Sequence, residues 1–168
     1  MTADGKSYGC IMVEFDMPEQ LCQSVIKRLG LESDVYDDDS KEYGIETKPH
    51  VTLLYGIHED VSLDEIKKHL PSISEMTAII SGISHFKCND YDVLKFDIDS
   101  PKLHEINKNI CDNVPFTNEF PDYIPHMTIA YLKKGCGEKY NDNNYSIPIK
   151  PLRYRYGFAD NHDEYFTL

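Results

Sequence analysis

Residues 49–55, PHVTLLY, recur as PHMTIAY at residues 125–131, with Pro, His, Thr and Tyr at matching positions. Both copies are rich in apolar residues and are typical of β-strands. Because side chains two positions apart on a strand project from one face, the His and the Thr of each copy lie side by side. The alternating residues point to the opposite face, where they can pack against helices: Val51 and Leu53, then Met127 and Ile129. The final Tyr of each copy falls out of phase with the His and the Thr and is predicted to pack in the core.

Two such His–Thr pairs facing each other make a complete site for cleaving a phosphodiester. One neutral imidazole can take a proton from the attacking hydroxyl, and one imidazolium can protonate the leaving oxygen, because the pKa of imidazole lies near neutral pH. The threonine hydroxyls can donate hydrogen bonds to the non-bridging oxygens, whose charge grows in the transition state. This chemistry requires neither a metal nor a cofactor. The candidate catalytic residues are therefore His50, Thr52, His126 and Thr128, and the doubled motif favours this interpretation over two buried structural histidines.

The segments around the two motifs predict further strands and three helices. Strands are expected at Gly9–Phe15, His50–Tyr55, Met76–Phe86, Asp92–Ile98, Ile124–Leu132, Ser146–Leu152 and Tyr154–Phe158. Helices are expected between capping signals and a closing Gly or Pro: from Asp16 with Glu19 to Gly30, from Ser62 with Glu65 to Pro71, and from Ser100 with Pro101 onward. Because most strands lack a following crossover helix, the pattern indicates an α+β fold with antiparallel sheet, in a single domain over residues 1–168.

Composition and charge exclude several functional classes. The chain has 168 residues and a formal net charge of −12, which disfavours long nucleic acids and membranes, because both bind proteins through cations that neutralise phosphates. No apolar run approaches the roughly 20 residues of a membrane span, and the polar start does not resemble a signal peptide. The five cysteines are scattered and form no C-x-x-C pair, which predicts a cytoplasmic protein without disulfides or a zinc site. A small anionic ligand can still enter a locally neutral site.

The doubled pattern P-H-[VM]-T-[LI]-x-Y, with its histidines 76 positions apart, resembles the motifs of the two-histidine (2H) phosphoesterase superfamily. The order of the predicted elements is similar to that family as well. The resemblance implies a bilobal two-histidine phosphoesterase-like fold, in which two antiparallel sheets with helices outside surround a central cleft. It also implies that His50, Thr52, His126 and Thr128 lie at the floor of that cleft.

The sequence PHVTLLYG at residues 49–56, the small size and the acidic charge are most similar to the bacteriophage members of that superfamily. Those members degrade the cyclic-oligonucleotide signals of bacterial anti-phage defence (CBASS). The resemblance implies a metal-independent hydrolase without a cofactor that cleaves cyclic di- or trinucleotides in the host bacterial cytoplasm and so helps a phage to evade immunity. Its partner is then a cyclic oligonucleotide, and neither a long nucleic acid nor a membrane.

Five further side chains are candidates for binding the substrate. Tyr8, Phe120 and Tyr123 lie near the ends of predicted strands, where an aromatic ring can stack on a nucleobase. Arg153 and Arg155 alternate with aromatic residues on the last predicted strand and can offer cations to a phosphate. A surface pair of arginines fits the same pattern equally well.

Three alternative functions remain open from the sequence. The protein can be an RNA-end enzyme that opens 2′,3′-cyclic phosphates or ligates such ends, although its charge disfavours long RNA. It can be a binding module that sequesters a nucleotide without cleaving it, in which case the nucleotide is recovered intact. It can also be a mononuclear metal protein that uses His50 and His126, which metal analysis would detect.

Overall fold

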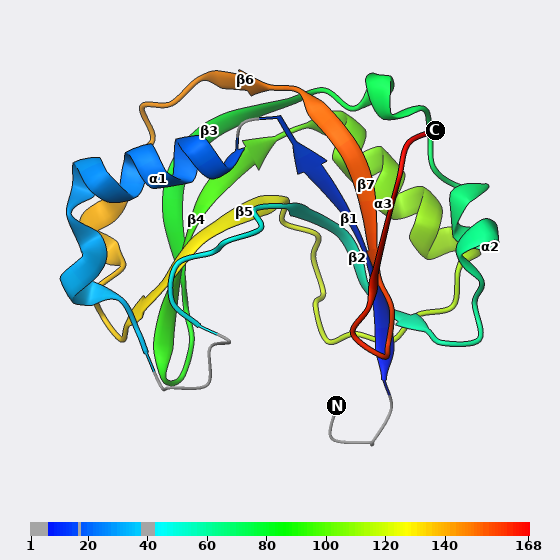
Figure 1. Ribbon diagram of the computed structural model, residues 1–168, viewed down its shortest axis with the longest axis horizontal. Helices are drawn as coiled ribbons and strands as arrows, with labels where there is room; N and C mark the ends of the chain where they lie inside the picture. The colour runs from blue at the N-terminus through cyan, green and yellow to red at the C-terminus, as the bar shows by residue number, and fades with distance from the viewer. Residues whose placement is uncertain (1–6, 17, 38–42) are drawn as a thin grey trace.

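Eight strands form one curved antiparallel sheet in the computed structural model, which describes residues 7–16, 18–37 and 43–168 (Figure 1). The strands are β1 Tyr8–Phe15, β2 Val51–His58, β3 Ala78–Lys87, β4 Tyr91–Asp99, β5 His126–Lys133, β6 Ile147–Ile149, β7 Pro151–Gly157 and β8 Asp163–Phe166. The helices are α1 Pro18–Leu29, α2 Leu63–Lys67 and α3 Pro101–Asn113, with 3₁₀ turns at Leu31–Asp34, Ile73–Glu75 and Glu138–Tyr140. The predicted α+β class is confirmed, and β8 is a strand that the sequence pattern did not predict.

The sheet consists of two halves of four strands, in the order β6-β3-β4-β5 and β2-β1-β7-β8. We call these halves the β5 lobe and the β2 lobe, and Figure 1 shows them as the two legs of an arch. The strands β2 and β5, which carry the two motifs, join the lobes through a single register pair, Val51 with Met127. The two predicted sheets are therefore continuous with each other, because the motif strands bond at this pair before they diverge.

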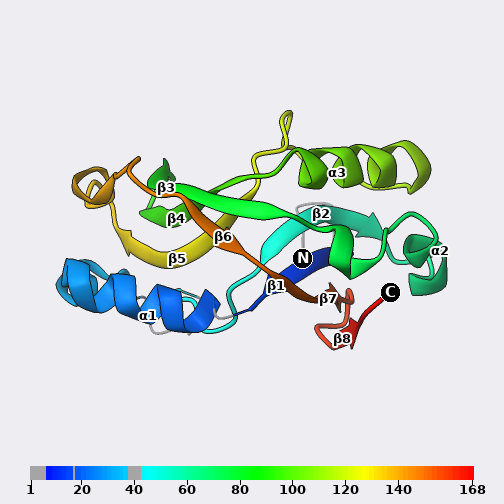
Figure 2. The ribbon, with the colours of Figure 1, turned by 90° about the horizontal axis from the view of Figure 1, so that it is seen from above.

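The long helices lie on the outer side of the arch, and each follows a strand of one lobe but lies against the other (Figures 1 and 2). Helix α1 follows β1 and lies beside the β5 lobe, whereas α3 follows β4 and lies beside the β2 lobe. The Asn107 side chain of α3 donates to the Leu53 carbonyl of β2 at 2.7 Å. Apolar residues on one side of each helix are buried: Cys22, Val25 and Ile26 in α1, and Leu103, Ile106 and Ile110 in α3.

Capping signals fix the starts of two helices as predicted. The Ser62 hydroxyl accepts a hydrogen bond from the Glu65 amide at 3.2 Å, and the Ser100 hydroxyl accepts one from the Leu103 amide at 3.1 Å. Pro101 occupies the first turn of α3, where its missing N–H has no helical partner to lose. The predicted cap at Asp16 with Glu19 depends on a segment outside the residues that the structure fully describes.

The predicted alternation on the motif strands is present in the structure. Val51 and Leu53 of β2, and Met127 and Ile129 of β5, are fully buried on the side that faces the helices. The opposite side of these two strands faces the inside of the arch. We call it the inner face. None of the helices among the described residues is long and apolar enough to span a membrane.

Loop segments cover the edges of the motif strands where these strands diverge. The amides of Tyr36 and Glu46 donate to carbonyls of β5 at 2.9 Å each. The amide of Thr117 donates to the Gly56 carbonyl of β2 at 2.8 Å. Each motif strand is thus bordered by the segment that leads into the other motif, and its edge is not left open to pair with another chain.

Candidate active site

The two motif histidines lie next to each other where the lobes join. Because Val51 pairs with Met127 in antiparallel register, His50 lies opposite Thr128, and Thr52 lies opposite His126. The four candidate catalytic residues therefore meet on the inner face, as the sequence predicts. Each imidazole is opposite the hydroxyl of the other motif.

Both imidazoles are held by the same backbone contact. The Nδ1 atom of His50 lies 2.9 Å from the Lys48 carbonyl, and the Nδ1 atom of His126 lies 2.7 Å from the Ile124 carbonyl. In each case the partner is the carbonyl two residues earlier, and a carbonyl only accepts. Nδ1 therefore carries the hydrogen, and Nε2 is the nitrogen that gains or loses a proton.

A guanidinium nitrogen of Arg155 lies 2.8 Å from the same Nδ1 atom of His50. A guanidinium only donates, so Nδ1 cannot accept from Arg155 while it donates to the Lys48 carbonyl. The identical geometry at His126 assigns the Nδ1 hydrogen to the carbonyl. Arg155 then acts on His50 as a neighbouring cation.

Two buried cations flank the histidines, one in each lobe. Arg155 of β7 is 5% exposed, and its Nη1 atom lies 3.8 Å from a carboxylate oxygen of Glu14. Lys95 of β4 is 4% exposed, and its ammonium donates to Asp97 and to the Ser84 hydroxyl at 2.6 Å each. Each imidazole thus has a cation as its neighbour, and each of these cations lies beside a carboxylate. Sequence reasoning proposed Arg155 but missed Lys95, whose signal is a charged residue between the apolar residues of a predicted strand.

Burial lowers the pKa of both histidines below the ordinary value of 6.5. The hydrogen bond from each Nδ1 to a carbonyl acts in the opposite direction. The positive charges of Arg155 near His50 and of Lys95 near His126 lower the pKa values further. Both imidazoles are therefore mainly neutral at pH 7.

Backbone and thiol contacts surround the motif threonines. Thr52 hydrogen-bonds through its side chain to the Cys10 thiol, whose pKa is raised to about 12, chiefly by burial. The Tyr123 hydroxyl donates to the Thr52 carbonyl at 2.8 Å. On the other lobe, Thr128 pairs in register with Lys95.

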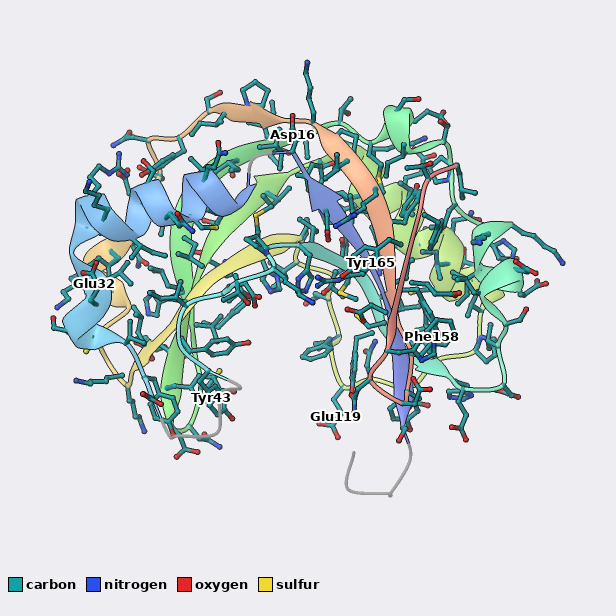
Figure 3. The ribbon with its side chains drawn as sticks, viewed as in Figure 1. Asp16, Glu32, Tyr43, Glu119, Phe158 and Tyr165 are labelled. Atoms are coloured by element: carbon teal, nitrogen blue, oxygen red, sulfur yellow. The ribbon has the colours of Figure 1, made fainter. Side chains whose placement is uncertain are left out.

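The structure distributes the remaining candidate binding residues among different surroundings. Tyr123 is committed to the Thr52 backbone, and Arg153 is held by Glu14 through two hydrogen bonds of 3.1 and 3.0 Å. Phe120 is 70% exposed, and the neighbouring Glu119 lies on the inner side of the β2 lobe in Figure 3. Tyr8 packs against other rings, 6.4 Å from Tyr55 and 6.0 Å from His58. Of the five candidates, only Arg155 contacts a motif histidine in the contacts described.

A β-bulge follows the Thr in each motif strand. The register between β1 and β2 skips Leu53, and the register between β4 and β5 skips Ile129. Each extra residue shifts the alternation by one position, so Tyr55 and Tyr131 face the same side as the His and the Thr. Tyr55 is 40% exposed. The prediction that the motif tyrosines pack in the core is wrong, because it assumed that the alternation continues without interruption.

The sequence does contain a signal for these bulges. Two apolar residues in a row follow the Thr in each copy, Leu53-Leu54 and Ile129-Ala130. All four are buried, although a regular strand would expose every second residue. Among the described residues, no three His, Cys, Asp or Glu side chains gather in a way that could hold a metal ion.

Comparisons with known proteins identify similar sequences and folds. The family model described as "2'-5' RNA ligase superfamily" matches residues 18–135. The solved structure of Kluyveromyces marxianus Usb1 has a TM-score of 0.57 at 10% identity, with 97% of this chain and 99% of that chain covered. E. coli LigT complexed with 3′-AMP has a TM-score of 0.55 at 12% identity, with 97% and 95% covered. The K. marxianus Usb1 structure with uridine monophosphate has a TM-score of 0.54 at 10% identity, with 97% and 99% covered. No curated protein sequence matches the chain.

Proposed function

Because the chain belongs to the 2′-5′ RNA ligase superfamily of 2H phosphoesterases, we propose that His50, Thr52, His126 and Thr128 form its catalytic site for cleaving a phosphodiester. We propose further that the substrate is a cyclic di- or trinucleotide signal of bacterial anti-phage defence. The phage-like sequence at residues 49–56 and the net charge of −12 support this substrate class. The protein would then act for a phage in the cytoplasm of its bacterial host.

The observation that carries the catalytic proposal is the equivalent anchoring of the two imidazoles. Each Nδ1 donates to the carbonyl two residues earlier, and both histidines stand on one face of adjacent strands. One titratable Nε2 atom of each histidine is thereby available, so that a phosphate can bind between the two. A purely structural role for the histidines would not require the same geometry in both lobes.

The proposed reaction is a general acid–base displacement at phosphorus. One neutral histidine takes the proton of the ribose 2′-hydroxyl, and the 2′-oxygen bonds to phosphorus as the bond to the 5′-oxygen breaks. The other histidine, protonated, gives its proton to that leaving oxygen. The products are a 2′,3′-cyclic phosphate and a free 5′-hydroxyl. Water can then open the cyclic phosphate with the two histidines in exchanged roles, and direct attack by water on the original diester is the alternative first step.

The threonines and the buried cations stabilise charge in this scheme. The hydroxyls of Thr52 and Thr128 donate to the non-bridging oxygens as negative charge develops on them. Arg155 and Lys95 are buried beside the histidines, where their charges attract the phosphate although the protein as a whole is acidic. Arg155 and Lys95 thus supply the positive charge that a small anion needs for binding next to the histidines.

The test is a substrate panel followed by mass spectrometry. Cyclic dinucleotides, a cyclic trinucleotide, nucleoside 2′,3′-cyclic phosphates and a short RNA are each incubated with the protein, with and without excess chelator. We expect cleavage of the cyclic oligonucleotides at a rate that chelator does not change. Recovery of every nucleotide intact would indicate a sequestering module instead of an enzyme. Loss of activity in chelator would favour a metal site.

A second candidate is an RNA-end 2′,3′-cyclic phosphodiesterase. It is favoured by the structural similarity to Usb1, which has been solved with uridine monophosphate, and to LigT, which has been solved with 3′-AMP. In the same panel, this function predicts that the RNA end and the 2′,3′-cyclic phosphates react faster than any cyclic oligonucleotide. That result would overturn the substrate class that we propose.

A further inference from the structure

Glu14 joins two arginines on the face of the β2 lobe that bears His50. Its Oε1 atom accepts hydrogen bonds from Nε and Nη2 of Arg153 at 3.1 and 3.0 Å, and its Oε2 atom lies 3.8 Å from Nη1 of Arg155. The Glu14 side chain is only 12% exposed. One carboxylate therefore serves two guanidinium groups. We call these three residues the Arg–Glu–Arg triad, and its two positive charges and one negative charge leave a net charge of +1.

The two arginines of the triad differ in what they can contact. The Nε and Nη1 atoms of Arg155 are buried, so a ligand cannot touch them and their charge acts only at a distance. The Arg153 side chain is 43% exposed. A guanidinium has five N–H groups, and Glu14 takes two of those of Arg153, which leaves three on Nη1 and Nη2. Among the residues that the structure describes, none accepts a hydrogen bond from these three.

Glu14 and Tyr165 hold the Arg153 guanidinium in one orientation. The guanidinium carbon lies 4.2 Å from the centre of the Tyr165 ring, which is a cation–π contact, and Figure 3 shows Tyr165 on the β2 lobe. Tyr165 pairs in register with Arg155 and so lies on the same face of the sheet. A guanidinium that is already fixed loses little conformational entropy when it binds an anion. Arg153 therefore presents a preorganised fork that can donate to two phosphate oxygens at once.

Arg153 lies two strands away from His50. Val13 of β1 pairs with Val51 of β2, and Glu14 of β1 pairs with Arg153 of β7. The next antiparallel step after Val13 and Val51 places Glu14 opposite His50, so that His50, Glu14 and Arg153 form a row across the sheet. Neighbouring strands are about 4.8 Å apart, which puts the Arg153 backbone roughly 10 Å from that of His50. Because Glu14 stands between them, Arg153 is held back from a phosphate at the histidines.

We propose that Arg153 binds a second phosphate of the substrate, one nucleoside away from the phosphate that is cleaved. This proposal rests on the proposed function and narrows its substrate to nucleotides with at least two phosphates. A cyclic di- or trinucleotide supplies the second phosphate, whereas a nucleoside 2′,3′-cyclic phosphate has none and gains nothing from Arg153. Asp163 of β8 does not cancel the charge there, because it lies opposite Gly157, four positions or about 13 Å along β7 from Arg153.

A pair of dinucleotides that differ by a single phosphate tests the proposal. Calorimetry with the His126→Ala variant, in which cleavage is removed, measures the binding of 3′,3′-cyclic di-AMP and of linear ApA, which lacks the phosphate that closes the ring. Arg153→Gln, Arg153→Lys and Glu14→Gln are each added to this background. Lys108→Gln is the matched control, because Lys108 pairs with a carboxylate as Arg153 does but lies on the outer helix α3.

We expect Arg153→Gln to weaken the binding of cyclic di-AMP by about tenfold or more, as for the loss of a hydrogen bond to a charged group, and to leave the binding of ApA unchanged. Arg153→Lys keeps the charge but not the fork, so its affinity should lie in between. Glu14→Gln adds one positive charge to the triad, so cyclic di-AMP should gain affinity relative to ApA. A purely structural pair predicts instead that Arg153→Gln and Glu14→Gln weaken both probes alike. Lys108→Gln should bind both probes like its parent.

Two results with the Arg153 variants would overturn the proposal and leave the catalytic proposal standing, provided that the unaltered protein cleaves cyclic di-AMP. Equal weakening of both probes would mean that Arg153 acts on the cleaved phosphate or on the fold, and no weakening of either would mean that it binds no phosphate. If the unaltered protein neither binds nor cleaves any nucleotide, the proposed function fails and the second site fails with it. Thermal melting checks that each variant is folded. If Glu14→Gln is not, because it leaves the buried charge of Arg155 unpaired, the two Arg153 variants decide.

Discussion

His50 and His126 have the same backbone contact, but the proposed reaction gives one the role of base and the other the role of acid. We therefore expect that neither histidine can perform the function of the other. His50→Ala or His126→Ala should each lower kcat by about 10²- to 10⁴-fold, because each removes one proton-transfer group. Steady-state kinetics on the best substrate of the panel measures the effect. His162→Ala is a suitable control, since His162 stacks on Phe158 and pairs with Asp160. A rate near that of the unaltered protein in either motif variant would contradict the two-histidine mechanism.

The lowered pKa values of the two histidines predict an acidic pH optimum. In the proposed mechanism, the rate needs one histidine neutral, so it rises as pH increases through the pKa of that histidine. The mechanism needs the other histidine protonated, so the rate falls as pH increases above the pKa of the second one. Because the pKa values of both lie below 6.5, the maximum of kcat/KM should also lie below about pH 6.5. A profile from pH 4.5 to 8.5 tests this prediction, and a maximum at pH 8 would contradict it.

Lys95 gives this profile a specific test. Lys95→Met removes a cation near His126 and leaves the Asp97 carboxylate with its hydrogen bond from the Ser84 hydroxyl but without its ion-pair partner, and both changes favour the protonated imidazole. The pKa of His126 should rise, and the limb of the profile that it controls should move to higher pH. Lys139→Met is the control, because Lys139 pairs with Asp34 instead. An unchanged profile would mean that Lys95 does not influence His126 or that His126 does not control this limb of the profile.

Among the strands and helices, sequence reasoning succeeded where the periodic pattern continued without interruption. The alternation of Val51 and Leu53 with His50 and Thr52 correctly predicted the buried side of β2. The same reasoning failed three residues later, because a bulge depends on how a strand bonds to its neighbour. The pairing of two strands distant in sequence is not visible in either strand alone. For the same reason, the sequence indicated Arg155 as a candidate but could not place it beside His50, which it reaches across β1.

Gly56, at the edge of β2, combines two restrictions that an alanine would violate. Its φ angle is +94°, and a Cβ atom there would lie 2.0 Å from the Thr117 carbonyl oxygen. Gly135 has a similar φ of +83° but no atom within 4 Å of the Cβ position, which makes Gly135→Ala a matched control. We expect Gly135→Ala to cost about 1–2 kcal/mol from backbone strain, and Gly56→Ala to cost a further 1–3 kcal/mol or so from overpacking.

Urea unfolding of the two alanine variants measures this difference. A larger loss at Gly56 would show that the segment at residues 115–118 is held tightly against β2. Equal losses would mean that this segment moves away at little cost. In that case it would not be a rigid border for the site.

For the molecule as a whole, the net charge of −12 predicts how catalysis responds to salt. An anionic substrate is repelled at long range, and salt screens this repulsion as the Debye length falls from about 30 Å at 0.01 M to about 8 Å at 0.15 M. We therefore expect kcat/KM for a cyclic dinucleotide to rise over this range. Proteins that bind polymeric nucleic acid through counterion release lose affinity instead. A fall in kcat/KM would indicate an extended cationic surface that the composition argues against.

The crossed placement of α1 and α3 has a consequence for how the chain could be divided. The β5 lobe takes its strands from residues 78–149 but its covering helix from residues 18–29, and the β2 lobe takes strands from both ends of the chain but its helix from residues 101–113. No single cut yields a fragment that contains one complete lobe. Two fragments made by opening the chain between α2 and β3 would each expose apolar surface that only the other can cover. We expect them to be insoluble or unfolded apart and to recover activity only when produced together. That result would make the two copies of the motif interdependent parts of one folding unit.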